Sequence, residues 1–197
     1  MKNTRSLSVA VAIALYAQIV SAQGLVTYKP PQIGAPATRV GGGTRGLNAK
    51  MPQLEVLAPP QTALTTQSQP VLYWYLSPND MHVVEISVIQ EGVAPPLLET
   101  TLPLLQQAGV QRIRLADYGV SLQPGQEYRW SVAVVKDKEQ RSGDIVASAT
   151  LRYQMPAAPL DSIEPQAEAG CWYDALKQAV EKHSPLANEL LKQIGLE

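Results

Sequence analysis

The chain of 197 residues has little of what most metal and redox centres require: one cysteine, two histidines and no phenylalanine. A single cysteine excludes an intrachain disulfide, a cysteine-based zinc site and an iron–sulfur cluster. Two histidines leave little basis for a metal site, and nothing in the sequence indicates a cofactor. A formal net charge of −1 and a pI near 6.1 exclude a nucleic-acid binder that relies on a general basic surface.

The first 22 residues are typical of a secretory signal peptide. Lys2 and Arg5 are their only charges, a short apolar stretch follows, and Val20-Ser21-Ala22 supplies the small residues for cleavage after Ala22. The apolar stretch is shorter than the roughly 20 residues of a membrane-spanning helix. We therefore expect a periplasmic or extracellular protein without a stable membrane span.

Export also bears on the single cysteine. Small exported domains usually rely on disulfides, whereas this chain carries only Cys171. We expect packing alone to stabilise the domain. Cys171 fits a buried apolar position, and the alternative that it joins two molecules stays open.

The mature chain divides into four parts by composition. Residues 23–53 are rich in Pro and Gly without a hydrophobic period, which predicts an extended arm. Residues 54–153 alternate between apolar and polar side chains, the pattern of β-strands. Residues 154–165 contain three prolines and are read as a linker. Residues 166–197 have the apolar spacing of helices.

The middle part predicts a mainly β fold, an antiparallel sandwich. About seven short strands are expected in roughly 100 residues, which is the count and spacing of such sandwiches. No helical pattern lies between them, which excludes a parallel βαβ sheet. The expected strands are 54–57, 71–76, 82–90, 98–102, 111–115, 128–135 and 145–153.

One motif narrows the type of sandwich. The segment Leu122-Gln-Pro-Gly-Gln-Glu-Tyr128 followed by Arg129-Trp130 resembles a turn of fibronectin type III domains. In immunoglobulin-like sandwiches a tyrosine at this place turns its hydroxyl back onto the backbone just upstream. We expect an immunoglobulin-like sandwich in which Tyr128 is structural, with Trp130 and Trp74 as core aromatics in place of phenylalanine.

The last part predicts a helical hairpin. From Trp172, apolar residues recur at helical spacing with Lys and Glu on the opposite face. Ser184-Pro185 begins a second helix, and Gly195 ends it. Two such short helices are unstable alone, so they must pack on each other and on the sandwich or a partner.

Six motifs are spread through nearly the whole mature chain: Arg39-Val-Gly-Gly-Gly-Thr-Arg-Gly46, Pro70-Val-Leu-Tyr-Trp-Tyr75, Glu85 in the following strand, Leu122-Gln-Pro-Gly125 with Tyr128-Arg-Trp130, Arg141-Ser142 and Trp172-Tyr-Asp-Ala-Leu176. Together they resemble a bacterial family of exported proteins catalogued as domain of unknown function nine-two-eight. The resemblance implies a signal peptide, a Gly-Thr-Arg arm, a β domain and a helical Trp-Tyr-Asp segment. Many members carry a Cys after the Tyr-Arg-Trp motif, where this chain has Val135-Lys136-Asp137. The resemblance brings no activity with it.

Aromatic side chains are the best candidates for binding. If Leu72, Trp74 and Leu76 face the core, Tyr73 and Tyr75 face outward, and exposed tyrosines suit recognition of proteins or sugars. The alternative is that the arm or the C-terminal helices cover this face. Trp172 and Tyr173 allow the same two interpretations: a binding surface, or contacts that dock the helices onto the sandwich.

Candidate catalytic residues are few. Asp80 and His82 lie two apart and could form a hydrolase site with a hydroxyl, but no Gly-x-Ser-x-Gly motif accompanies them. Asp80 is more simply explained as the end of a Ser-Pro-Asn-Asp turn, and His82 as an exposed strand start. The sequence therefore favours an exported, non-catalytic protein-interaction module, an adaptor or accessory factor that binds an envelope or secreted protein. A carbohydrate-binding module and a hydrolase that uses Asp80 and His82 are the alternatives.

Overall fold

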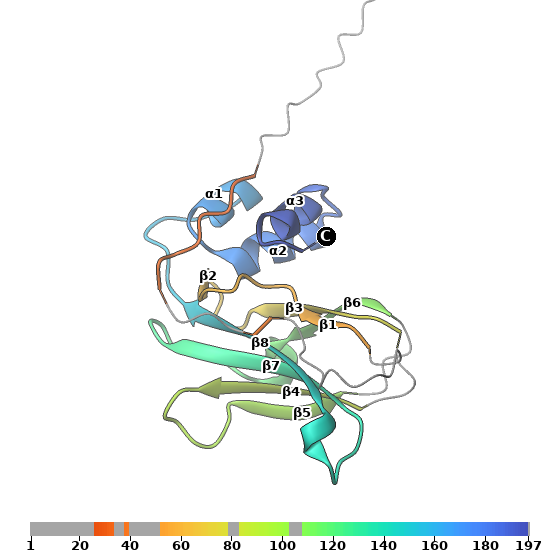
Figure 1. The fold of residues 1–197 in the computed structure, drawn as a ribbon. Helices are drawn as coiled ribbons and strands as arrows, with labels where there is room; N and C mark the ends of the chain where they lie inside the picture. The colour runs from red at the N-terminus through yellow and green to blue at the C-terminus, as the bar shows by residue number, and fades with distance from the viewer. Residues whose placement is uncertain (1–25, 34–37, 40–51, 79–82, 103–107, 197) are drawn as a thin grey trace, which may run out of the picture.

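The alternating segments of the middle region form two sheets that pack face to face (Figure 1). The computed structural model describes residues 26–33, 38–39, 52–78, 83–102 and 108–196. Sheet A has the order β1-β3-β6, with β1 (Leu54–Val56), β3 (Val71–Leu76) and β6 (Gly109–Arg114). Sheet B has the order β2-β8-β7-β4-β5, with β2 (Ala63–Thr65), β8 (Ile145–Tyr153), β7 (Glu127–Val135), β4 (Val83–Gln90) and β5 (Leu98–Leu102). Two short 3₁₀ turns, η1 (Leu115–Tyr118) and η2 (Arg141–Gly143), follow β6 and β7.

The core between the sheets follows from the alternation, because successive side chains of a strand point to opposite faces. Trp74 of β3 and Trp130 of β7 lie on the inner faces and are fully buried, as the sequence predicts. The inward-facing residues of β4, β7 and β8 that alternate in the sequence are also buried: Val84, Ile86, Val88, Val132, Val134, Ile145, Ala147, Ala149 and Leu151. Two large indole rings thus fill the volume that phenylalanine supplies in other domains.

The expected corner contact of Tyr128 is present. Tyr128 lies one residue into β7 and is buried, and its hydroxyl accepts a hydrogen bond from the backbone N–H of Gln123 at 2.9 Å. The contact ties the turn before β7 to the strand itself. Tyr128 therefore has a structural role in the sandwich.

The sandwich is not wholly antiparallel, which corrects the expectation. Strand β2 pairs in parallel with β8, Ala63 opposite Leu151 and Thr65 opposite Tyr153, so sheet B is mixed. All other strand pairs are antiparallel among the residues that the structure describes. The sequence gives no signal for β2, because its three residues Ala63-Leu64-Thr65 are all buried and do not alternate, unlike those of the equally short β1.

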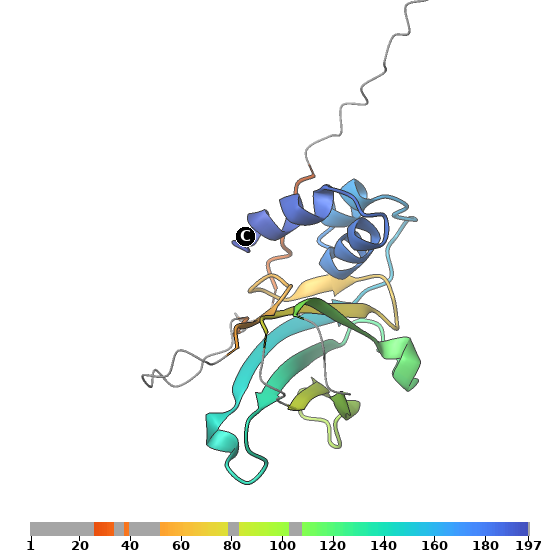
Figure 2. The same ribbon diagram turned by 90° about the vertical axis from the view of Figure 1, so that its right-hand side faces the viewer.

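Three helices, not a two-helix hairpin, form a layer over the outer face of sheet A (Figures 1 and 2). They are α1 (Ile163–Glu168), α2 (Trp172–Glu181) and α3 (Leu186–Gln193). Helix α1 begins inside the segment that the sequence marks as a linker, 154–165. Pro165 is its third residue, and proline is tolerated there because the first N–H groups of a helix have no intrahelical partner.

Residues 26–33, here called the N-terminal strap, run in extended form across the helices (Figure 1). The Gln193 side-chain amide accepts from the N–H of Tyr28 at 2.7 Å and donates to the carbonyl of Val26 at 2.8 Å. The Tyr28 ring meets Trp172 edge-on, with centroids 4.9 Å apart. The strap thus bridges α2 and α3.

The next described piece of the arm, residues 38–39, joins the two sheets at one edge. The carbonyl of Thr38 accepts from Ser148 of β8 at 2.7 Å, and the carbonyl of Arg39 accepts from Val56 of β1 at 3.0 Å. Residues 23–25, 34–37 and 40–51 of the expected arm, and the expected signal peptide, residues 1–22, lie outside the described residues. Within the described residues, no helix is long and apolar enough to cross a membrane.

Candidate functional site

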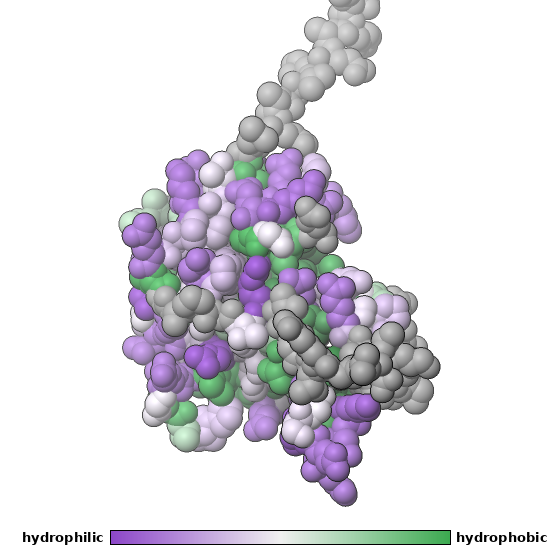
Figure 3. Space-filling view, in the orientation of Figure 1, coloured by the Kyte–Doolittle hydropathy of each residue, from purple (hydrophilic) through white to green (hydrophobic). Residues whose placement is uncertain are grey.

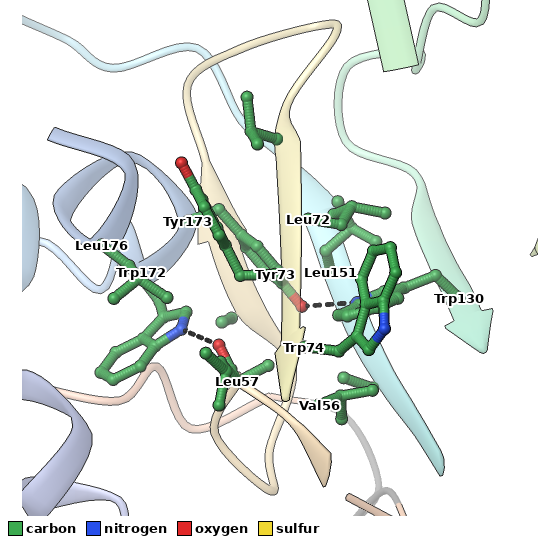
Figure 4. Close-up of a cluster of buried hydrophobic side chains, with 14 of the residues drawn as sticks. Val56, Leu57, Leu72, Tyr73, Trp74, Trp130, Leu151, Trp172, Tyr173 and Leu176 are labelled. Carbon is green, nitrogen blue, oxygen red and sulfur yellow. Dashed lines mark hydrogen bonds between the residues drawn. The ribbon is translucent and has the colours of Figure 1, made fainter. Parts of the chain in front are cut away.

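The helix layer is fastened to the sandwich by three consecutive residues at the start of α2, Trp172-Tyr173-Asp174, here called the α2 anchor. The Trp172 indole N–H donates to the carbonyl of Leu57 at 2.9 Å. The Tyr173 hydroxyl donates to the carbonyl of Thr150 at 3.2 Å and accepts from the indole N–H of Trp130 at 3.0 Å (Figure 4). These bonds are buried and reach both sheets.

The third member of the anchor, Asp174, holds the end of β2. Its two carboxylate oxygens accept hydrogen bonds from Thr65 Oγ1 at 3.0 Å and from the N–H of Thr66 at 2.6 Å. Only 5% of Asp174 is exposed. This burial raises the pKa of its carboxyl above the ordinary value, and the hydrogen bonds from Thr66 and Thr65 offset part of the rise.

The anchor settles how two of the candidate binding residues lie. Trp172 and Tyr173 are buried, so they do not form an exposed surface. Their side chains dock the helices onto the sandwich, which is the second of the two interpretations that the sequence allows. Consecutive helix residues point in directions about 100° apart. Trp172, Tyr173 and Asp174 can therefore all be buried and hydrogen-bonded because the sandwich surrounds the first turn of α2 on several sides.

Tyr73 and Tyr75 lie on the outer face of sheet A, but they do not form an exposed pair. Tyr73 is 2% exposed beneath the helix layer, and its burial raises the pKa of its hydroxyl. Of the two interpretations that the sequence allows, an exposed tyrosine or one covered by the arm or the C-terminal helices, the position of Tyr73 agrees with the second. Tyr75 is half-buried, and of the four candidate binding residues it alone retains an accessible part.

A groove of about 500 Å³ opens at Tyr75, between α3 and the outer face of sheet A. We call it the α3 groove. Sheet A supplies its floor and α3 with the following residues supplies its wall. Hydrophobic surface is visible between the helix layer and the sheet in Figure 3. The residues that line it are Gln53, Glu55, Leu57, Tyr75, Val110, Asn188, Leu191, Lys192 and Leu196.

The floor of the groove is a row of three side chains across sheet A. Glu55 of β1 lies opposite Tyr75 of β3, which lies opposite Val110 of β6. Residues directly opposite in antiparallel strands share a face, so the three side chains lie next to one another. Val110 is 54% exposed, an unusual position for a valine in a sheet.

Two residues of the lining carry charges of opposite sign: Glu55, at one end of the row, and Lys192, on α3. Burial raises the pKa of the Glu55 carboxyl, and the charge of Arg39 lowers it in part. The guanidinium of Arg39 donates to the carbonyl of Ile194 at 2.7 Å, at the end of α3. Neither Glu55 nor Lys192 has an ion-pair partner within 4.0 Å among the described residues.

Sequence reasoning found Tyr75 but missed the rest of the groove. A usable signal was present in β6, where Val110 is an apolar residue in phase with Arg112 and Arg114, on the outward side of the strand. The contribution of α3 had no such signal. Leu191 reads as part of the ordinary apolar stripe of an amphipathic helix.

The remaining candidates are Asp80, His82 and Cys171. Asp80 and His82 lie outside the described residues. Cys171 is buried, and desolvation raises the pKa of its thiol to about 12, which removes the thiolate needed of a nucleophile. The described part of the chain contains no cluster of three His, Cys, Asp or Glu side chains that could hold a metal ion.

One protein-family model covers most of the chain, including the residues whose contacts are described above. The model described as Domain of Unknown Function (DUF928) matches residues 40–197, which include both sheets and all three helices. The chain belongs to this family. The α2 anchor, the row that contains Tyr75 and the corner at Tyr128 all lie within the matched residues. No curated protein matches the sequence.

Two solved structures are similar to part of this DUF928 chain. One is an engineered protein with a TM-score of 0.35 and 12% identity; the match covers 52% of this chain and 20% of the other. The second is a computationally redesigned β-sandwich protein with a TM-score of 0.30 and 13% identity, covering 51% of this chain and 90% of the other. The chain thus spans about a fifth of the length of the first.

Proposed function

We propose that this DUF928 protein is an exported, non-catalytic protein-interaction module, an adaptor or accessory factor, whose docking surface is the α3 groove. The observation that carries the proposal is the row of Glu55, Tyr75 and Val110, on the part of sheet A that the helix layer leaves open. Export rests on the signal-peptide pattern of residues 1–22.

The chemistry of the groove supports a protein partner. Interfaces combine an apolar, aromatic centre with a polar rim, and tyrosine is frequent among the residues that dominate binding. Here Tyr75 and Val110 form the centre, while Asn188 and Lys192 supply polar groups on the rim. A volume of about 500 Å³ accommodates a few side chains of a partner.

We also propose that the scaffold is an immunoglobulin-like sandwich of the fibronectin type III kind. The strand order supports it, with β1, β3 and β6 in one sheet and β4, β5, β7 and β8 in the other. The hydrogen bond between Tyr128 and Gln123 is the corner contact of that fold.

Site-specific photocrosslinking in the cell envelope tests the docking surface. A benzophenone amino acid replaces Val110 in one variant and Val146 in a control. Val146 lies on the outer face of sheet B and is 42% exposed, so both probes start from an accessible valine in a strand. We expect a light-dependent protein adduct from position 110 and none from position 146.

A second pair of variants separates loss of contact from loss of fold. Tyr75→Ala, combined with the probe at 110, should abolish the adduct, whereas Val146→Asp should leave it intact. Both proteins should retain the far-ultraviolet circular dichroism of the wild type. Equal adducts from both probe positions, or none from position 110, would contradict the proposal.

A further inference from the structure

The α3 groove also has features that select among protein partners, and this inference rests on the function proposed above. We propose that the groove takes an extended peptide segment in which a large apolar side chain is followed, two residues along, by lysine or arginine. The apolar side chain lies on Tyr75 and Val110 against Leu191, and the basic group pairs with Glu55.

The spacing comes from the strand register. Glu55, Tyr75 and Val110 occupy three neighbouring strands at one level of sheet A. Neighbouring strands are about 4.8 Å apart, so Glu55 and the far side of the row are separated by roughly 10 Å. In an extended peptide, side chains two residues apart point to the same side and are spaced by roughly 6.6 Å. An apolar residue centred between Tyr75 and Val110 therefore brings the second residue along close to Glu55.

The charge preference comes from the unequal surroundings of the two flanking charges. Glu55 lies in a strand on the floor and is half-buried, with no ion-pair partner among the described residues. Lys192 is exposed on a helix surface, where water already solvates the ammonium group. A partner gains more by supplying a cation to Glu55 than by supplying an anion to Lys192, because a pair at the half-buried site is screened less.

Among the described residues, Arg39 is the cation whose charge lowers the pKa of Glu55. Its guanidinium already donates to the carbonyl of Ile194 at 2.7 Å. Arg39 thus lies near the groove without forming a direct ion pair with Glu55. A lysine or arginine of a bound peptide can supply this missing pair.

Selection from a random peptide library displayed on phage tests the inference. The purified exported chain is the target, and Val110→Arg is used for counter-selection, since a large cation at this exposed position occupies the floor and repels a basic peptide. We expect the enriched peptides to share a large apolar residue with Lys or Arg two positions along. A synthetic peptide from the selection should bind Val110→Arg at least about tenfold more weakly than the wild-type chain.

Glu55→Gln separates the charge preference from the docking surface. We expect it to weaken binding of the same peptide about threefold to tenfold. A peptide with glutamine in place of the basic residue should bind both chains equally. The matched control is Glu99→Gln in β5, an exposed carboxylate on sheet B, which should leave the affinity unchanged.

The outcomes distinguish the two proposals. Peptides that require the groove but lack a basic residue, prefer an acidic one or bind Glu55→Gln as tightly as the wild type overturn this inference and leave the docking surface standing. Peptides that bind Val110→Arg as tightly as the wild type overturn the docking surface itself.

Discussion

Tyr173→Phe tests whether the α2 anchor stabilises the fold through its hydrogen bonds. The substitution removes one hydroxyl and keeps the buried ring. In the wild type that hydroxyl accepts from Trp130 Nε1 at 3.0 Å and donates to the carbonyl of Thr150 at 3.2 Å. The phenylalanine variant therefore leaves an indole N–H unsatisfied in the core.

The expected loss of stability follows from these two bonds. An unsatisfied buried donor costs about 1–3 kcal/mol, and a net hydrogen bond contributes about 0.5–1.5 kcal/mol. Because the two terms share one hydroxyl and are not fully additive, we expect Tyr173→Phe to lower the free energy of unfolding by about 2–3 kcal/mol. In a domain of this size that corresponds to a melting temperature lower by roughly 5–10 °C.

Urea unfolding followed by tryptophan fluorescence measures the effect. All three tryptophans, Trp74, Trp130 and Trp172, are fully buried, so their emission reports loss of the core and of the helix layer. Tyr75→Phe is the control, since its half-buried hydroxyl has no hydrogen-bond partner among the described residues. The control should stay within about 0.5 kcal/mol of the wild type.

A double-mutant cycle with Trp130→Phe assigns the loss to the pair. Once the indole N–H is gone, removing the Tyr173 hydroxyl should be less damaging, which gives a coupling energy of about 1 kcal/mol or more. If Tyr173→Phe is as stable as Tyr75→Phe, or if the coupling energy is zero, the anchor does not work as described.

Three further outcomes follow from the described residues. Because burial raises the pKa of Asp174 in the folded chain, the folded state binds its proton more tightly than the unfolded state. Relative to Asp174→Asn, the wild type should therefore be most stable below the unfolded pKa of about 3.9, and it should lose this advantage as the pH rises through the folded pKa of Asp174. Urea titrations from pH 3 to pH 8 measure this dependence, and an opposite slope would refute the assignment. The thiol of Cys171, with its pKa raised to about 12, should resist Ellman's reagent at pH 8 until urea unfolds the chain, and prompt labelling of the folded chain would refute its burial. Gly170 and Gly195 both have φ of +77°. A Cβ at Gly170 would lie 2.9 Å from Pro31 Cδ, whereas a Cβ at Gly195 would point into open space among the described residues. Gly170→Ala should therefore release the strap to limited proteolysis, Gly195→Ala should not, and equal protection of the strap in both variants would contradict its packing.

The parts of the fold that could be predicted are those whose pattern depends on one face being buried. Strands β4, β7 and β8 each alternate over eight or nine residues, and their inward side chains are buried as expected. Strand β2 has no such alternation, because all three of its residues are buried. Helix α1 was hidden by Pro165, a residue that is typical of a linker and is equally compatible with the first turn of a helix.

Alternation predicts which side of a strand a residue faces, but it does not predict what covers that side. Tyr73 and Tyr75 share one face of β3, yet Tyr73 lies under the helix layer and Tyr75 lines the groove. The difference depends on where α2 and α3 end, a tertiary feature without local signal. The strap is a second tertiary feature without local signal. Val26 and Tyr28 are buried, and their backbone is hydrogen-bonded to the side-chain amide of Gln193 in α3.

The anchor and the groove are physically connected. Helix α2 is fixed at its first turn by buried hydrogen bonds to both sheets. Helix α3 is held by its packing on α2, by the strap at Gln193 and by Arg39 at the carbonyl of Ile194. The wall of the groove is therefore positioned by contacts outside the groove, and Leu191 of α3 lines it together with Tyr75. A groove that is already formed spares the partner the cost of ordering it, so affinity can come from a small set of contacts. Substitutions in the anchor should accordingly weaken binding at the groove even though none of the anchor residues lines it.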